Sequence, residues 1–267
     1  MTHIAFGASL IFIPGDLDEA IYNDMAAAGL ETFEISASKL SQVDQRQAFK
    51  QLASRPGPKA SSLHALFGAE YDFSRLELDR WQYAVNRAVE TVEAAAELDI
   101  PIIVFHASFE PIPPDERSHR IDRALQGFNL IGQKARLRGR RIAIEYLPRS
   151  CLGNNLAELN LLIDRLGEDT FGVCLDVNHL MAHHAELPQI AQSLGARLIA
   201  THLSDYDGVD EKHWLPGKGV LNWPGFMHAL REIDYKGPFT YECNLESDSL
   251  PEKLAKLREN YNWLSSL

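Results

Sequence analysis

Short apolar runs alternate with longer amphipathic segments along the chain. Eight runs rich in Ile, Val, Phe and Thr recur about every 25 to 40 residues. A buried run followed by a segment with helical spacing is the pattern of a parallel sheet built from βαβ units. The runs are approximately His3–Phe12, Thr32–Ala37, Ala60–Ala65, Ile100–Ala107, Arg141–Leu147, Phe171–Val177, Leu198–Leu203 and Pro238–Cys243.

The segments between the runs carry apolar residues at helical spacing. Eight strand-then-helix units with no spare segment predict an α/β fold, a closed (β/α)₈ TIM barrel that forms a single domain over residues 1–267. An open doubly wound sheet is the alternative, but it usually shows a glycine-rich turn after its first strand, and Ala8–Gly15 has no G-x-G-x-x-G. The predicted helices include Leu17–Ala28, Leu76–Leu98, Arg117–Arg138, Leu156–Leu166, Leu187–Leu194, Trp223–Ile233 and Leu250–Leu267.

Most of the apolar runs end in a residue that can bind a metal ion or move a proton. In a barrel the carboxyl ends of all strands lie on one face, so these side chains are expected to meet there. One such residue is more often a helix cap or a wall residue, whereas six on six successive strands favour an active site. In chain order they are His64, His106, Glu145, Asp176, His202 and Glu242.

Three carboxylates and one imidazole end the last four predicted strands: Glu145, Asp176, His202 and Glu242. This oxygen-rich set suits a hard divalent cation such as Mn²⁺, Mg²⁺ or Co²⁺, and Zn²⁺ is less favoured. Burying three carboxylates together without a cation is costly or forces protonation. The sequence therefore predicts one divalent metal, with Mn²⁺ expected first.

Other polar residues near the strand ends are candidates for binding a substrate. His179 follows the sixth strand directly and can hydrogen-bond a hydroxyl group of a ligand. His64 and His106 are expected to do the same, with backbone-bonded wall histidines as an equal alternative. The segment from His202 to Trp223 is expected to form a polar loop over the site. Its Gly-x-Gly, Gly217-Lys218-Gly219, predicts turn glycines rather than a phosphate loop.

Composition and charge limit which binding partners are expected. Asp and Glu total 37 against 26 Lys and Arg, a formal charge of −11, and such a surface repels phosphate backbones, so no nucleic-acid partner is expected. No apolar stretch approaches the length of a membrane span, and the first residues do not resemble a signal peptide, so we expect a cytoplasmic protein without a membrane partner. Cys151, Cys174 and Cys243 are odd in number and well separated, which fits reduced thiols.

At these residues the chain resembles the sugar phosphate isomerase/epimerase superfamily, the xylose isomerase-like TIM barrels. The resemblance covers essentially the whole chain and is specific for the superfamily rather than for one member. It rests on Ile144-Glu145, the segment Gly172–His179, the segment His202–Asp205, His213 with Pro216–Gly219, and Tyr241-Glu242.

The superfamily's ketose epimerases imply roles for the residues that match them. Glu145, Asp176, His202 and Glu242 would bind the metal, Glu145 and Glu242 would also form the catalytic acid/base pair, and His179 would contact the substrate. The arginine that those epimerases carry six positions after the metal-binding histidine would fall at Gly208, so one of their substrate contacts is missing here.

The resemblance implies a metal-dependent isomerase or epimerase of carbohydrate metabolism. Its substrate would be a small keto or aldo sugar or a related polyol ketone, and the proton transfer would pass through a metal-stabilised enediolate. Elimination like that of inosose dehydratase or of a 3-keto-glycoside lyase stays open as an alternative. Barrels of this kind often pair, so a homo-oligomer is one expected state.

Endonuclease IV, an apurinic/apyrimidinic endonuclease of the same superfamily, is the alternative from another class. Glu211 stands where that family has an aspartate, and the acidic balance lacks the basic stripe that a DNA-binding face requires. The sugar isomerase is therefore the favoured prediction. The trinuclear zinc site of endonuclease IV would fall on His64, His106, Glu145, Asp176, His179, His202, Glu211, His213 and Glu242.

Overall fold

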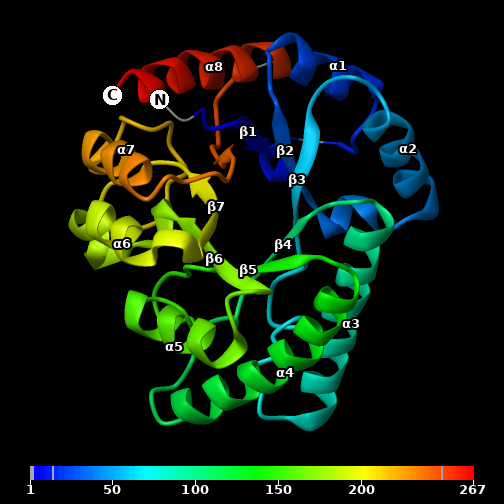
Figure 1. Ribbon diagram of the computed structural model, residues 1–267, viewed down its shortest axis with the longest axis vertical. Coiled ribbons are helices and arrows are strands. Elements are labelled where there is room, and N and C mark those ends of the chain that lie inside the picture. The colour runs from blue at the N-terminus through cyan, green and yellow to red at the C-terminus, as the bar shows by residue number, and fades with distance from the viewer. Residues whose placement is uncertain (1–2, 14, 248) are drawn as a thin grey trace.

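The strands form one closed parallel barrel in chain order, and the helices surround it (Figure 1). The computed structural model describes residues 3–13, 15–247 and 249–267, so residues 1, 2, 14 and 248 of the predicted 1–267 domain lie outside the described residues. The predicted single-domain (β/α)₈ barrel is confirmed. Its strands are β1 (Phe6–Ser9), β2 (Thr32–Ser36), β3 (Lys59–His64), β4 (Ile102–Phe105), β5 (Arg141–Glu145), β6 (Phe171–Asp176), β7 (Leu198–Leu203) and β8 (Phe239–Tyr241).

The helices follow the strands as predicted, with one addition. Helix α2 is absent from the predicted set because it is mostly polar, and only Phe49 and Leu52 of its residues are buried. In Figure 1 the last helix lies beside the first, so the two ends of the barrel wall meet. The α-helices are α1 (Glu19–Ala27), α2 (Val43–Ala53), α3 (Leu78–Glu97), α4 (Arg117–Leu137), α5 (Leu156–Leu166), α6 (Leu187–Leu194), α7 (Trp223–Glu232) and α8 (Leu250–Ser266).

Several strands are shorter than the apolar runs predict. The run His3–Phe12 contains only the four residues of β1, because Leu10–Phe12 turn into a 3₁₀ helix. Strands β4 and β8 end at Phe105 and Tyr241, so His106 and Glu242 are the first residues after their strands rather than the last within them. Both still lie at the carboxyl end of the barrel, where the site was predicted.

The inside of the barrel is built in layers. Alternate residues of a strand point to the same face of the sheet, so residues two positions apart share the barrel interior. The layer below the polar strand ends consists of small or branched buried side chains. These side chains support the polar residues above them. This layer is Val104, Ala143, Cys174 and Ala200, each two positions before His106, Glu145, Asp176 and His202 respectively.

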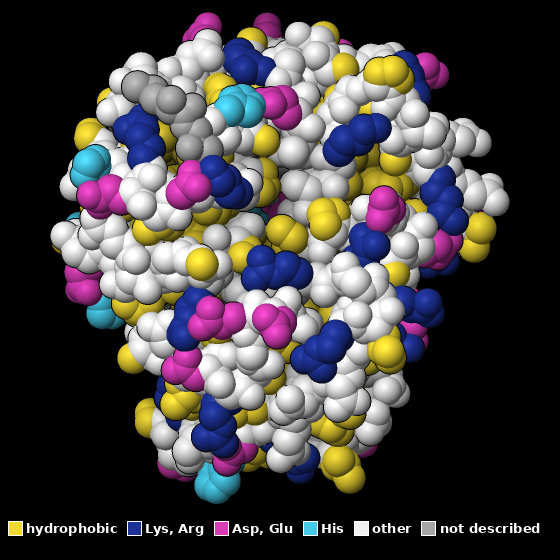
Figure 2. All heavy atoms as spheres, in the orientation of Figure 1, with side chains coloured by type: hydrophobic (Ala, Val, Ile, Leu, Met, Phe, Trp, Pro, Cys, Tyr) yellow, Lys and Arg dark blue, Asp and Glu magenta, His cyan; other side chains and the backbone are white. Residues whose placement is uncertain are grey.

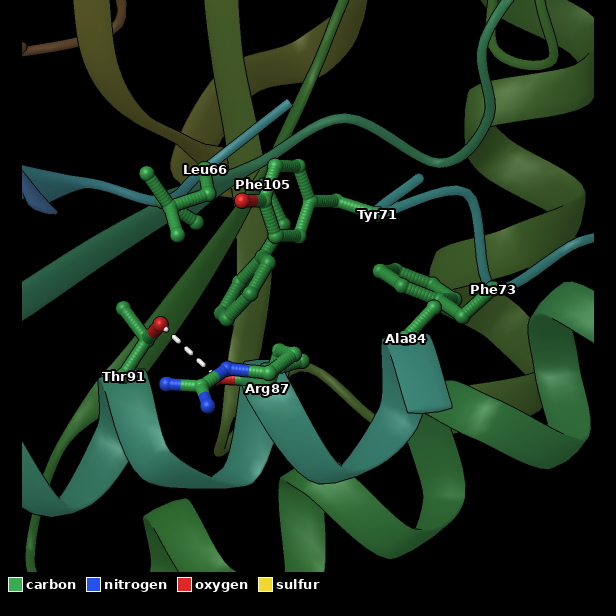
Figure 3. A pocket seen from close by; sticks show the side chains of 9 residues that line it. Leu66, Tyr71, Phe73, Ala84, Arg87, Thr91 and Phe105 are labelled. Carbon is green, nitrogen blue, oxygen red and sulfur yellow. Dashed lines mark hydrogen bonds between the residues drawn. The ribbon is translucent and has the colours of Figure 1, made fainter. Parts of the chain in front are cut away.

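The long loop between β3 and α3 packs against the barrel and against α3. Figure 3 shows Leu66 and Tyr71 from this loop beside Phe105 of β4, with the middle of α3, around Arg87, below them. The cavity that these side chains enclose measures about 10 Å³, which is the space of one water molecule. This cavity is therefore a small gap in the packing beneath the loop, and not a ligand pocket.

A buried ion pair fixes the same loop to α4. An Arg120 nitrogen lies 2.6 Å from Asp72 Oδ2, and Arg120 Nε donates to Ser74 Oγ at 3.0 Å. Both charged side chains are nearly inaccessible to solvent. Removing one partner of such a pair leaves the other charge buried without compensation, which is far more costly than losing a surface pair.

We predict that Asp72→Ala lowers the free energy of unfolding by about 3 to 5 kcal/mol, measured by urea denaturation. Glu97→Ala is the matched control, since it removes the exposed pair between Lys50 and Glu97 and should cost less than about 1 kcal/mol. Equal effects of the two substitutions would contradict the structural role of the buried pair.

The described surface carries charges of both signs, and the three thiols lie beneath it. On the face seen in Figure 2, Lys and Arg side chains are interspersed with Asp and Glu. Cys151, Cys174 and Cys243 are free and buried, as expected for reduced thiols. Among the described residues, no helix combines the length and apolar character that a bilayer crossing requires.

Candidate active site

Four donor groups from four consecutive strands converge on one point inside the carboxyl end of the barrel. His202 Nδ1 lies 3.2 Å from Glu145 Oε1, 3.2 Å from Glu242 Oε2 and 3.9 Å from Asp176 Oδ2. One donor atom from each of the four residues lies within 4.8 Å of the others. All four side chains are buried. The structure thus brings together the four residues that the sequence predicted as metal ligands.

The charges in this cluster act strongly on one another. Burial alone would raise the pKa of Glu145, but the imidazoles of His106 and His202 hold it well below its usual range. Burial raises the pKa of Glu242 to about 7 in spite of the neighbouring imidazole of His202. Burial would lower the pKa of His202, but the surrounding acids raise it well above its usual value. The cluster therefore attracts positive charge, which a proton or a metal cation can supply.

One carboxylate oxygen in the cluster lacks a hydrogen bond. Asp176 Oδ1 accepts the backbone N–H of Asn178 at 2.8 Å, whereas the buried Oδ2 accepts no hydrogen bond from the described residues. A buried carboxylate oxygen without a hydrogen bond is costly, and here only the imidazoles of His179 and His202 lie near it, at 3.3 and 3.9 Å. Since Oδ2 points to the same place as the other three donors, the residues fit a cation bound at this point.

Two histidines flank the other side of Glu145. His64 Nε2 and His106 Nε2 lie 3.2 and 3.0 Å from Glu145 Oε2. His64 Nδ1 lies 2.8 Å from the carbonyl oxygen of Ala65, so both nitrogens of His64 have partners, whereas the His106 side chain is 17% exposed. The ring of Phe67 stacks on His106 at a centroid distance of 4.8 Å. The structure brings both predicted histidines to the site, with His106 nearer to solvent.

His179 lies at the edge of the same cluster. Its Nδ1 is 3.0 Å from the carbonyl oxygen of Tyr146 and 3.3 Å from Asp176 Oδ2. Its Nε2 faces the loop between β7 and α7, at 3.6 Å from Glu211 Oε2. His213 Nε2 lies 3.8 Å from the same oxygen. His179 therefore connects the buried donors to the loop above them.

A buried aspartate organises the loop between β7 and α7. The carboxylate of Asp205 accepts the backbone N–H of Gly217 at 2.9 Å and the indole N–H of Trp223 at 2.8 Å. Gly217 has a φ of 86°, and a Cβ on Gly219 would collide with the backbone of Tyr206. The two glycines therefore serve turns and close approach, as the sequence predicts.

Sequence reasoning missed one buried acid of the site. Glu34 of β2 is inaccessible to solvent and lies 3.1 Å from His202 Nε2. The hydroxyls of Ser62 and Ser9 donate to its carboxylate at 2.7 and 3.2 Å. The available signal was a single acidic residue between Phe33 and Ile35, inside an otherwise apolar run.

Residues 22–267 match the family model described as the xylose isomerase-like TIM barrel. The chain therefore belongs to this family, and the resemblance found in its motifs is confirmed at that level. Its fold is also that of sugar epimerases. A solved D-tagatose 3-epimerase-like protein has a TM-score of 0.84 and 22% identity, with 98% of this chain and 99% of that chain covered.

Relatives by sequence fall into more than one class. An uncharacterized protein of Sinorhizobium fredii is 27% identical over 85% of this chain and 71% of its own length. A probable endonuclease 4 of a Sulfurihydrogenibium species is 25% identical over 74% of each chain. An inosose isomerase of Halalkalibacterium halodurans is 21% identical over 57% of this chain and 56% of its own length.

The side chain of Arg149 ties together three loops at the mouth of the site. It forms ion pairs with Glu110 at 2.6 Å, Asp210 at 3.0 Å and Glu211 at 2.6 Å. These partners come from the loops after β4 and β7, while Arg149 comes from the loop after β5. The arginine therefore holds Glu211 in place beside His179.

We predict that Arg149→Met increases amide hydrogen exchange in residues 207–213 at least tenfold. The free energy of unfolding should change by less than about 1 kcal/mol, because the Arg149 side chain is 44% exposed. Arg138→Met, which breaks an exposed pair with Glu93, is the control. Unchanged exchange in this loop would show that Arg149 does not hold it.

Proposed function

We propose that this chain is a divalent-metal-dependent sugar isomerase or epimerase that works by proton transfer. The observation that carries the proposal is the convergence of three buried carboxylates and His202 Nδ1 on one point, where Asp176 Oδ2 accepts no hydrogen bond from the described residues. The sugar epimerase fold and the inosose isomerase relative support a small keto or aldo sugar, or a related polyol ketone, as the substrate class.

Glu145, Asp176, His202 and Glu242 would hold the cation. Mn²⁺ is our first choice because carboxylate oxygens dominate the set, with Mg²⁺, Co²⁺ and Zn²⁺ as alternatives. When bound, the cation would polarise a substrate carbonyl and its neighbouring hydroxyl and so stabilise the enediolate left after proton loss. A bound cation would explain why so much negative charge is buried in one place.

The two glutamates of the set are our proposed acid and base. Their carboxylate oxygens lie within 4.8 Å of each other and reach the same point from β5 and from the end of β8. Without a cation, Glu145 has a depressed pKa and Glu242 has one near 7, so the environment already separates their protonation. One glutamate would remove the proton from carbon, and the other would return one to the adjacent carbon or to the opposite face.

The neighbouring histidines are proposed to bind the substrate. Burial lowers the pKa of His106, so its neutral ring can hydrogen-bond a hydroxyl, and its partial exposure supports such a contact. His179 lies between Asp176 and the loop and would contact a second oxygen. We propose that His64, whose nitrogens already face Glu145 and a carbonyl, acts on substrate mainly through Glu145.

We predict that Glu145→Gln and Glu242→Gln each reduce turnover at least a hundredfold in a folded protein. The assay incubates keto and aldo sugars, inososes and 3-keto-glycosides with enzyme and Mn²⁺ in D₂O, and NMR detects deuterium at carbon. Glu259→Gln on the exposed face of α8 makes the same charge change as a control. Near-normal exchange in the Glu242 variant would remove it from the acid/base pair.

Metal removal gives a second test, on the protein without substrate. Mn²⁺ at 100 times its dissociation constant should stabilise the chelator-treated protein by about 2.7 kcal/mol. Asp176→Asn should raise the melting temperature of the metal-free protein, since it removes one of the crowded charges, and should abolish the gain from Mn²⁺. Asp122→Asn on α4 is the exposed control. The same Mn²⁺ response in all three proteins would contradict the proposed ligand set.

Phosphodiester cleavage is a second candidate, favoured by the endonuclease 4 relative and by the second ligand-capable group His64, His106 and Glu145. Against it, Glu211 is already paired with Arg149, and the formal charge is −11. Zinc-loaded protein incubated with duplex DNA containing an abasic site decides between the two. The sugar isomerase predicts no cleavage, whereas zinc-dependent cleavage with a steep salt dependence would favour the nuclease.

A further inference from the structure

Glu34 is a buried carboxylate that the proposed proton transfer does not use. It occupies the middle of β2, on the opposite side of the barrel from β6, and none of its surface is exposed. Its neighbours are the two serine hydroxyls and the His202 ring, with Nε2 at 3.1 Å. A carboxylate is seldom buried so completely without a function that repays its desolvation.

The two nitrogens of His202 face different partners. Nδ1 faces the proposed cation position, together with the oxygens of Glu145 and Glu242, whereas Nε2 faces Glu34. With a cation at the position that Nδ1 faces, the single hydrogen of the neutral ring would lie on Nε2, where the carboxylate of Glu34 can accept it. A neutral imidazole carries one N–H, which leaves the lone pair of Nδ1 free to bind a cation.

The position of Glu34 is itself determined by hydrogen bonds from neighbouring strands. Ser62 of β3 donates to Glu34 at 2.7 Å, and Ser9 of β1 donates at 3.2 Å. Ser62 and Glu34 are paired in the register of β2 and β3, and Ser9 and Glu34 are paired in that of β1 and β2. The carboxylate is thus held from both sides while it faces the imidazole, and it has little freedom to turn away.

We propose that Glu34 is a positioning residue for His202, which fixes the tautomer and the orientation of the ring so that Nδ1 binds the cation. This inference rests on the proposed function, because it assumes a metal at the four converging donors. Carboxylates that accept the distal N–H of a metal-bound histidine make the ligand more basic, and losing one typically weakens metal binding 10- to 100-fold. Glu34 itself would touch neither the metal nor the substrate.

The test measures Mn²⁺ affinity without substrate, from the EPR signal of free Mn²⁺. Glu34→Gln keeps the size of the side chain and removes its charge. We expect its dissociation constant for Mn²⁺ to be at least tenfold higher than that of the wild-type protein. Glu31→Gln is the matched control, because Glu31 lies just before β2 at the other end of the barrel and should leave the affinity unchanged within threefold.

Ser62→Ala keeps the test informative if Glu34→Gln does not fold. It removes the shorter hydrogen bond to Glu34 without altering His202, and it should weaken Mn²⁺ binding at least threefold. Ser61→Ala is its control, since the Ser61 hydroxyl donates to the backbone of Phe33 and not to the site. Equal affinities of the two serine variants would overturn the role of Glu34.

An NMR readout separates positioning from a purely structural role. In the Zn²⁺-loaded wild-type protein, His202 should show one slowly exchanging Nε2–H, assigned by its loss in His202→Asn. That proton should exchange at least tenfold faster in Glu34→Gln. An unchanged signal together with unchanged Mn²⁺ affinity would overturn the inference and leave the proposed metal intact, whereas a wild-type protein that binds no Mn²⁺ would overturn both.

Discussion

The concentration of negative charge around His202 is the constraint on which the rest of this site depends. One carboxylate oxygen from each of Glu145, Asp176 and Glu242 lies within 4.8 Å of the others and of a His202 nitrogen, and Glu34 faces the same ring from behind. In a buried environment such a group of carboxylates is stable only if protons or a cation balance it. The fold holds the group together because each residue lies within a strand, at its end or directly after it, and the strands cannot separate without opening the barrel.

The sequence predicts the barrel and most of this group for the same physical reason. Strand and helix periods differ, so the alternation of runs indicates βαβ units, and polar residues that end apolar runs mark the carboxyl face. Glu34 is different, since it lies inside its run and not at the end. Strand ends were also less predictable, because His106 and Glu242 follow their strands by one residue, and hydrophobicity does not mark where the ladder of hydrogen bonds stops.

The loops above the barrel hold contacts that the sequence did not predict. The position of their arginine is Gly208 here, and the arginine at the mouth of the site is Arg149, on the loop after β5. Arg149 is engaged by three acids, among them Glu211, which in turn faces His179 and His213. Such contacts connect residues on separate loops, and no spacing along the chain indicates them. In a barrel the loops after the strands carry much of the contact with ligands, so we expect substrate choice to depend on these loops.

The central claim is that a divalent cation binds where the four donors converge. Anomalous diffraction from crystals grown with Mn²⁺ tests it most directly, because the manganese signal locates the ion independently of the protein coordinates. We expect one strong peak bonded to His202 Nδ1 and to oxygens of Glu145, Asp176 and Glu242. An absence of any peak at this point, with the four side chains ordered, would contradict the claim.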